Sequence, residues 1–317
     1  MLASGVGRRH GIEVRCALLP VAEELRLFRY AGTLGRIVDG EAGLQVTLLD
    51  EGCAFGLLVR QADWVAQRGK QVVDAKPPSE LARDLLVLPE PRLPALEGIV
   101  SAPVFLRWGR LLATPGYDAE SRLWYEPSRD LQLPAIPPVP TEADVEGAVQ
   151  LLTEDLLVDF EFAAESDLAH ALAALLLPFV RRLIDGPTPV HLLEAPTPGS
   201  GKSLLADLIS IVALGRSCEA TTVTRNEDES RKKLTAILSR GRPIVVIDNL
   251  QGALESAQLA AAITAETWSD RLLGKTQMVE FPNRALWIVT GNNPKLSMEI
   301  ARRCIRIRLE PHQERPW

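Results

Sequence analysis

A short glycine-containing turn joins an apolar run to an apolar-periodic segment in the second half of the chain. The run is Val190 to Leu193, the turn reads Glu194-Ala-Pro-Thr-Pro-Gly-Ser-Gly-Lys-Ser203, and the periodic segment starts at Leu204. This pattern predicts a strand, a tight turn and a helix. Gly199 and Gly201 admit the dihedrals that let backbone N–H groups surround an anion, and the helix adds the positive end of its dipole. We therefore expect the turn to bind phosphate.

The residue types of the turn suit a nucleoside triphosphate. Lys202 is expected to reach the β- and γ-phosphates, and the Ser203 hydroxyl to ligate Mg²⁺. The expected nucleotide contacts are Pro198, Gly199, Ser200, Gly201, Lys202, Ser203 and Leu204. The motif G-x-x-x-x-G-K-[ST] requires glycine where this chain has Pro196, which lacks an N–H and leaves fewer donors at the loop entrance. An ordinary glycine and proline turn is the alternative interpretation.

A second apolar strand, Ile244 to Asp248, ends in a carboxylate. This is where a phosphate-loop enzyme holds its Mg²⁺, so Asp248 is the predicted metal-side residue. The next position often carries a glutamate that orients the attacking water, but here it is Asn249. An amide can position water but cannot accept its proton, which leaves Glu227 and Asp228 as weak alternatives. A hydrophobic strand that ends in aspartate is also common without any such role.

A third apolar strand, Ala285 to Thr290, is followed by Asn292 and Asn293, and Arg302 and Arg303 come shortly after. Taken alone, the asparagines could form a turn and the arginines a solvated face. The three pieces together have the order and spacing of an ATPase core. We therefore expect an enzyme that hydrolyses ATP.

These segments resemble the AAA+ core of superfamily-3 helicases and of the primase-helicase proteins of phages, plasmids and integrated elements. The residues that carry the resemblance are Gly199-Ser-Gly-Lys-Ser203, Ile247-Asp-Asn249, Asp270-Arg-Leu-Leu-Gly274, Thr290-Gly-Asn-Asn293 and Ala301-Arg-Arg303. The resemblance implies an α/β P-loop NTPase fold of AAA+ type. Its parallel sheet is flanked by helices and preceded by helices and a small mixed α+β module.

The resemblance also implies roles for single residues. Asn292 becomes the γ-phosphate sensor, and Arg302 or Arg303 becomes an arginine finger for the nucleotide of a neighbouring subunit. Such helicases project a hairpin into a central pore, and the matching segment here is Asp270 to Glu280, which overlaps a hairpin predicted at Leu272 to Phe281. Arg271 and Lys275 are the candidate DNA contacts, with an ordinary surface hairpin as the alternative.

The expected function is an ATP- and Mg²⁺-dependent DNA helicase or translocase of mobile-element replication. The expected partners are single-stranded DNA in the pore and further copies of the chain in a hexameric ring. The alternative is a nucleotide-switched DNA loading or assembly ATPase with little translocation, which Asn249 favours. A scaffold with a vestigial nucleotide site is a third possibility.

Proline density marks the predicted domain boundary. We expect an N-terminal accessory module over residues 1–126, a Pro-rich linker over 127–141, a helical lead-in over 142–186 and the ATPase core over 187–317. Thr141 and Asp144 form a predicted capping box, and a second helix is predicted from Ser166 to Ile184. The further predicted elements are strand Ala220 to Val223, helix Asp228 to Leu238, helix Ser256 to Ala265, helix Met298 to Ala301 and strand Cys304 to Leu309.

The composition limits the expected partners and cellular compartment of the protein. The net charge of −6 argues against a uniformly basic nucleic-acid coat, and the four cysteines form no C-x-x-C pair. The wide spacing of the cysteines favours a reducing, cytoplasmic setting. The most apolar run, Leu168 to Val180, is too short and broken to span a bilayer, so no membrane partner is expected. His170 and His191 are predicted as satisfied core histidines, Trp287 as core, and Trp108 as a weak stacking candidate.

Overall fold

Five parallel strands form the central sheet of the protein, in the order β13-β14-β18-β12-β20. Their bounds are β12 (Val190–Ala195), β13 (Ala220–Thr221), β14 (Ile244–Leu250), β18 (Leu286–Asn292) and β20 (Cys304–Arg308). The computed structural model describes residues 12–15, 26–40, 43–61, 63–68, 70–87, 93–128, 131–137, 139–222, 226–250, 253–271 and 278–311. The predicted parallel sheet flanked by helices is thus confirmed as a fold class.

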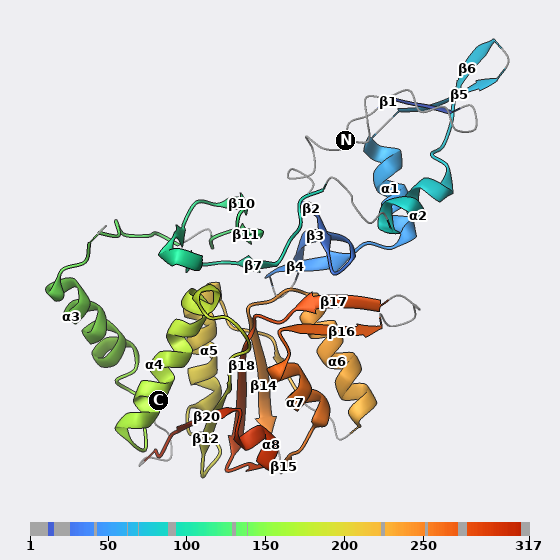
Figure 1. The fold of residues 1–317 in the computed structure, drawn as a ribbon. Helices are drawn as coiled ribbons and strands as arrows, with labels where there is room; N and C mark the ends of the chain where they lie inside the picture. The colour runs from blue at the N-terminus through green and yellow to red at the C-terminus, as the bar shows by residue number, and fades with distance from the viewer. Residues whose placement is uncertain are drawn as a thin grey trace.

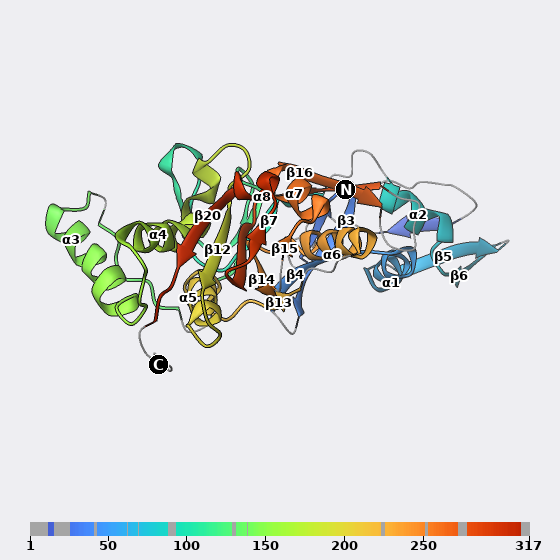
Figure 2. The same cartoon turned by 90° about the horizontal axis from the view of Figure 1, so that it is seen from below.

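Helices cover both faces of this sheet (Figures 1 and 2). α4 (Glu165–Val180) and α5 (Lys202–Leu214) pack on one face, and α6 (Glu227–Ser239) and α7 (Ala257–Thr264) pack on the other. Side chains alternate between the two faces, as strand geometry requires. In β14, Val245 and Ile247 join the core under α6 and α7, while Ile244 and Val246 join the core under α4 and α5.

A two-stranded hairpin rises beside the edge of the sheet that holds the amino ends of the strands (Figure 1). β16 (Thr267–Arg271) pairs antiparallel with β17 (Met278–Pro282). The prediction placed the whole hairpin within Leu272 to Phe281, but its first strand begins earlier, because buried Trp268 and Asp270 alternate with exposed neighbours. Lys275 lies outside the described residues. The short β15 (Ala253–Leu254) and β19 (Lys295–Leu296) pair with each other, and α8 (Met298–Ala301) precedes β20.

The N-terminal part is a mixture of short strands and helices, as expected. Its strands are β1 (Ile12–Arg15), β2 (Leu27–Tyr30), β3 (Thr33–Gly40), β4 (Gly43–Leu48), β5 (Asp63–Arg68), β6 (Gln71–Asp74), β7 (Gly98–Val100), β8 (Val104–Phe105), β9 (Leu111–Leu112), β10 (Gly116–Asp118) and β11 (Leu123–Tyr125). Its helices are α1 (Glu51–Gln61) and α2 (Ser79–Val87). Phe28, Tyr30 and Val46 belong to the same hydrophobic cluster as Trp287, so β2 to β4 pack directly on the core.

The helical lead-in begins at α3 (Glu142–Gln150), where Thr141 and Asp144 form the predicted capping box. A π-helical turn, Leu151–Leu156, continues it. The predicted second helix, Ser166 to Ile184, ends as an α-helix at Val180 and continues as the short 3₁₀ turn Arg181–Leu183. Within the described ranges, no helix combines the length and apolarity that crossing a bilayer requires.

The single-residue predictions of core positions are partly confirmed. Trp287 is buried, and His170 Nδ1 lies 2.9 Å from the carbonyl oxygen of Arg306. His191 is buried, as predicted, but its Nδ1 has no hydrogen-bond partner among the described residues, so the prediction that it is satisfied is wrong. Burial, aided by the charge of His170, lowers the pKa of His191 to about 4.

Candidate functional site

The glycine turn between β12 and α5 has the left-handed backbone that its sequence predicts. Gly199 has φ 72° and Gly201 has φ 83°. Gly201 is also the N-cap of α5, and no side chain caps this helix. The first N–H groups of α5 therefore have no side-chain acceptor, and with the helix dipole they favour an anion at this end.

Lys202 is held within the turn. Its Nζ donates to the Thr197 carbonyl at 3.0 Å and to Ser200 Oγ at 2.7 Å. Ser200 Oγ in turn donates to the Thr197 carbonyl at 2.9 Å. Lys202 is only 9% exposed, and burial lowers the pKa of its ammonium, with the charge of Asp248 acting in the opposite direction. The cation thus lies where the turn and α5 would hold a phosphate.

A carboxylate and two hydroxyls meet beside this turn. Ser203 Oγ donates to Asp248 Oδ1 at 3.0 Å, and Thr290 Oγ1 donates to the same oxygen at 2.5 Å. The Asn249 N–H donates to Thr290 Oγ1 at 2.9 Å. Oxygen donors of this kind are the ligands that Mg²⁺ prefers, so Ser203 and Asp248 suit the predicted metal role. Thr290 was not among the predicted site residues.

The sheet order brings the three predicted segments to one edge. β18 lies between β12 and β14. Asn292 pairs in register with Ala195, the last residue before the turn, and is exposed. Asn249 is exposed with φ 54°, where the pairing of β14 with β18 shifts register.

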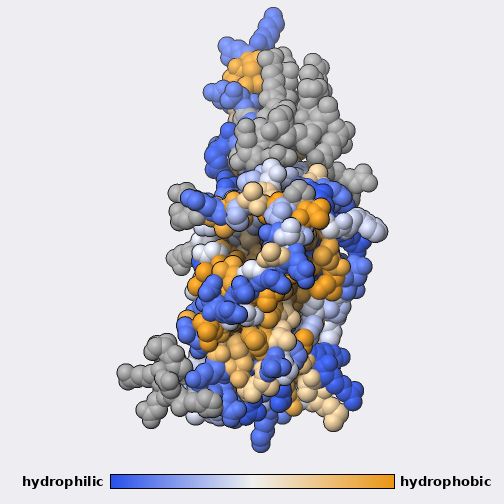
Figure 3. All heavy atoms as spheres, turned by 90° about the vertical axis from the view of Figure 1, so that its left-hand side faces the viewer, coloured by the Kyte–Doolittle hydropathy of each residue, from blue (hydrophilic) through white to orange (hydrophobic). Residues whose placement is uncertain are grey.

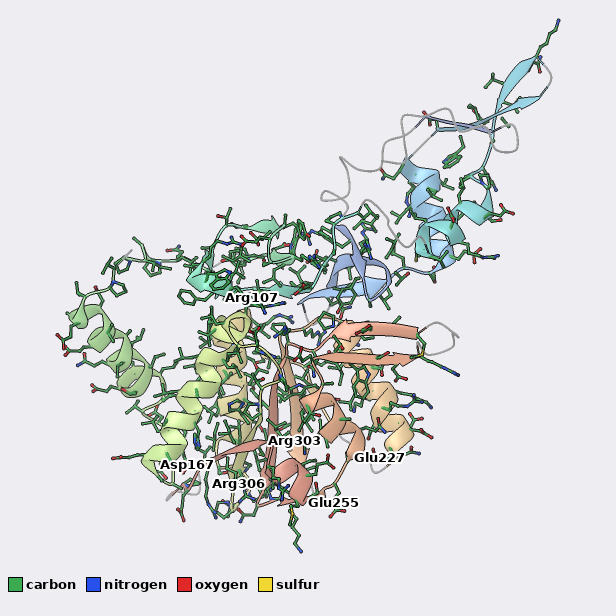
Figure 4. All side chains as sticks on the ribbon, in the orientation of Figure 1. Arg107, Asp167, Glu227, Glu255, Arg303 and Arg306 are labelled. Carbon is green, nitrogen blue, oxygen red and sulfur yellow. The ribbon has the colours of Figure 1, made fainter. Side chains whose placement is uncertain are left out.

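The weak alternatives for a water-activating carboxylate lie on α6. Glu227 Oε2 accepts hydrogen bonds from the Gln258 N–H at 3.1 Å and from Ser256 Oγ at 3.3 Å. This carboxylate therefore caps the start of α7 and ties it to α6 (Figure 4). Asp228 is exposed in the first turn of α6.

Arg302 and Arg303 lie away from the turn of their own chain. Arg303 Nη1 donates to the Glu299 carbonyl at 2.7 Å, and Arg302 Nη2 contacts Met298 Sδ. The carbonyl of Arg303 accepts from the Val190 N–H at the amino end of β12 (Figure 4). The five steps from Val190 to Ala195 span roughly 17 Å of strand, so no contact joins these arginines to the turn.

An apolar pocket of about 230 Å³ borders the turn. It is lined by Leu156, Asp159, Phe160, Glu161, Ser200, Gly201, Leu204, Leu208, Ile211 and Pro311. A Cβ on Gly201 would lie 3.7 Å from the Phe160 ring, so the aromatic side chain contacts the turn itself. Sequence reasoning missed Phe160, because no motif connects it with the turn.

The candidate DNA residues are only partly described. Arg271 is exposed at the end of β16, beside buried Asp270. Asp270 accepts from Arg231 and from Thr235 Oγ1, each at 2.6 Å. The neighbouring basic residues are also engaged, since Lys232 pairs with Glu229, Lys233 donates to Thr222, and Arg240 and Arg242 pair with Glu219.

Comparisons with known proteins give similarity to solved structures alone. No protein-family model matches the chain, and no curated protein matches it in sequence. The X-ray structure of JCV helicase is 17% identical with TM-score 0.31, covering 46% of this chain and 40% of that chain. The A-form apo structure of the NrS-1 C-terminal region is 16% identical with TM-score 0.36, covering 83% of this chain and 61% of that chain. This chain therefore spans less than two thirds of the length of either structure.

Proposed function

We propose that this protein is a P-loop NTPase that binds and hydrolyses ATP with Mg²⁺. The observation that carries the proposal is the hydrogen bond of 3.0 Å between Ser203 Oγ and Asp248 Oδ1, beside a glycine turn that holds Lys202. A lysine, a hydroxyl and a carboxylate in this arrangement suit a triphosphate and its metal ion.

Each group has a distinct part in the proposed site. Lys202 and the N–H groups of the turn bind the β- and γ-phosphates, and Ser203 and Asp248 hold the Mg²⁺ shell. Thr290 fixes the orientation of Asp248, and Asn292 lies at the same edge, where it senses the γ-phosphate. The pocket beside Phe160 is apolar and suits the nucleobase. When bound, Mg²⁺ supplies charge neutralisation at the transferring phosphoryl group.

The proposal extends to a DNA helicase or translocase of mobile-element replication that acts as a ring. The sequence resemblance supports this part, together with the position of Arg302 and Arg303 roughly one strand length from their own turn. A guanidinium in that position can serve the nucleotide of the neighbouring subunit. The β16–β17 hairpin with Arg271 is the proposed contact with single-stranded DNA.

A nucleotide-switched loading or assembly ATPase is the second candidate. The observation that favours it is Asn249, an exposed amide in the left-handed region at the position expected to orient water. An amide cannot take a proton from that water, so slow turnover is expected of such a protein.

The testing experiment is ATP hydrolysis with Mg²⁺, with and without single-stranded DNA, at several protein concentrations. Lys202→Ala should weaken nucleotide binding about tenfold or more, because it removes the ammonium group that pairs with the negatively charged phosphates. Lys70→Ala, an exposed lysine between β5 and β6, is the matched control. Unchanged turnover in Lys202→Ala would refute the nucleotide site. Binding of ATP without DNA-stimulated turnover would favour the loading ATPase.

A further inference from the structure

Arginines surround a small cavity at the opposite edge of the sheet, where the amino ends of the strands meet β7. Arg181 and Arg182 come from the turn after α4, Arg242 precedes β14, and Arg284 precedes β18. Glu97, just before β7, is the carboxylate among the lining residues. No motif in the sequence brings these residues together, and the proposed nucleotide site does not use them.

Arg181 is the most enclosed member of this arginine cluster. It is 5% exposed, and its Nη1 and Nη2 donate to the carbonyls of Ile184 at 3.0 Å and Gly186 at 2.7 Å. Its Nε is buried and has no acceptor among the residues that the structure describes. Burial, together with the positive charges of Arg284 and Arg182, lowers the pKa of Arg181 to about 10, while Glu266 acts in the opposite direction.

Carboxylates balance only part of this charge. Arg182 Nη1 pairs with Glu97 at 2.8 Å. Within the described ranges, no ion pair joins a carboxylate to Arg181 or Arg284, and Arg284 Nη1 donates to the Ile184 carbonyl at 3.2 Å. Arg242 pairs with Glu219, but its buried Nε has no acceptor in the described part of the chain. Buried guanidinium N–H groups that lack acceptors are costly and require an explanation, such as a bound anion.

The size and chemistry of the cavity select the ligand. Its volume is about 40 Å³, and a water molecule needs roughly 10 to 15 Å³ on this measure, so one tetrahedral oxyanion fits. Guanidinium groups bind such oxyanions through planar, paired N–H donors. We propose that this arginine cluster binds a phosphate group.

The phosphate could belong to a nucleic-acid strand or be free inorganic phosphate. Pro282 and Arg284 line both this cavity and a wider hollow beside the β16–β17 hairpin. Glu97, Glu266 and Glu280 also line that hollow, so it is less favourable to an anion than the arginine cluster itself. Because Arg284 lines both hollows, a DNA strand that runs along the β16–β17 hairpin would place one phosphate at Arg284.

The first test measures DNA binding. Fluorescence anisotropy of a labelled oligothymidylate is followed over a range of salt concentrations for the unaltered protein, Arg284→Gln, Arg284→Lys and Arg83→Gln. Arg83, exposed on α2, is the matched control. If the phosphate belongs to DNA, Arg284→Gln should lower the salt slope of log K by about 0.7, the value for one phosphate on a single strand. Arg284→Lys should keep the slope, since the charge remains.

The second test measures thermal unfolding with inorganic phosphate against chloride at matched ionic strength. Lys202→Ala controls for phosphate at the glycine turn, so it also separates this proposal from the proposed nucleotide site. If free phosphate is the ligand, it should raise the Tm of Lys202→Ala but not that of the double variant Lys202→Ala/Arg284→Gln. A lower salt slope for Arg284→Gln would support the site with DNA as the source of the phosphate. Loss of the phosphate-induced rise in Tm on substitution of Arg284 would support it with free phosphate as the ligand. The proposal would be overturned if Arg284→Gln had the same salt slope as Arg83→Gln and if phosphate raised the Tm of Lys202→Ala/Arg284→Gln as much as that of Lys202→Ala.

Discussion

The Asp248 carboxylate joins three elements through one oxygen. Ser203 at the start of α5 and Thr290 of β18 both donate to Oδ1, and the Asn249 N–H holds the Thr290 hydroxyl. A carboxylate with two hydroxyl donors is confined to one orientation, which a metal ligand requires. Thr290 begins one of the segments that carry the resemblance, but no role was predicted for it, because threonine inside an apolar strand is an ordinary β-former.

We predict that His191 lowers the free energy of unfolding in mild acid. Its folded pKa is about 4, below its unfolded value of about 6.5, so the unfolded chain takes up a proton first as the pH falls. The histidine has no effect on stability above pH about 6.5. Its destabilising contribution grows as the pH falls toward 4 and reaches about 3 kcal/mol at most.

Denaturant unfolding of the unaltered protein and of His191→Leu across this pH window measures the contribution. The difference in the free energy of unfolding should shift in favour of His191→Leu as the pH falls, because leucine cannot take up a proton. His170→Gln is the control for a less buried histidine on α4. A difference that stays constant from neutral pH to about 4.5 would contradict the assignment.

At the scale of elements, the strands of the central sheet were the most predictable feature. Residues 244–247 of β14 and 286–289 of β18 are buried on both faces, so each is a continuous apolar run in the sequence, and β12 is apolar apart from His191 and Glu194. The first strand of the hairpin was missed because buried Asp270 interrupts its apolar alternation. Its partners Arg231 and Thr235 lie more than thirty residues earlier in the chain.

The same limit applies to the candidate site. Its central motifs were predictable because the glycine turn and Asp248 follow predictable strands, and the carboxyl ends of parallel strands share an edge. The pocket beside Phe160 and the arginine cluster were not, because each is assembled from segments far apart in the sequence. Periodicity and local motifs contain no information on such contacts.

We predict that the exposed apolar side chains of α3 and of the turn after it form an interface between copies of the chain. Val145, Val149 and Leu151 are 54%, 53% and 58% exposed, although a surface helix normally buries its apolar side. Figure 3 shows further apolar side chains on this side of the molecule. Because these residues bury little in the single chain, Val149→Glu should leave the Tm nearly unchanged. If copies of the chain associate through this surface, Val149→Glu should lower the sedimentation coefficient at concentrations where the unaltered protein associates.

Val72→Glu is the matched control, since Val72 is 67% exposed on β6. It should change neither the Tm nor the sedimentation behaviour. Equal sedimentation of Val149→Glu and the unaltered protein, at concentrations where the latter associates, would exclude α3 from the interface.

At the scale of the whole molecule, the two predicted halves of one ATPase site lie apart in a single chain. The glycine turn and Asp248 are at the carboxyl edge of the sheet, while the Arg303 carbonyl contacts the amino end of β12. Roughly 17 Å of strand separates the two positions. If Arg302 or Arg303 is part of the proposed ATPase site, either a large rearrangement or a second copy of the chain must supply it.

Mixing of variants distinguishes these two arrangements. Arg302→Ala and Arg303→Ala should both still bind ATP. Whichever of the two arginines is the finger, its substitution should lower ATP turnover about 10³-fold, the lower end of the range for an arginine finger. Lys202→Ala lacks its own nucleotide site but keeps both arginines. If the finger acts between subunits, its mixture with the impaired variant should regain part of the ATPase activity, because a Lys202→Ala subunit can serve its neighbour's nucleotide. If the finger acts within one chain, the mixture should hydrolyse ATP no faster than the two variants measured separately. An Arg303→Lys variant that stays inactive alone would show that the planar fork is needed, since lysine supplies the same charge.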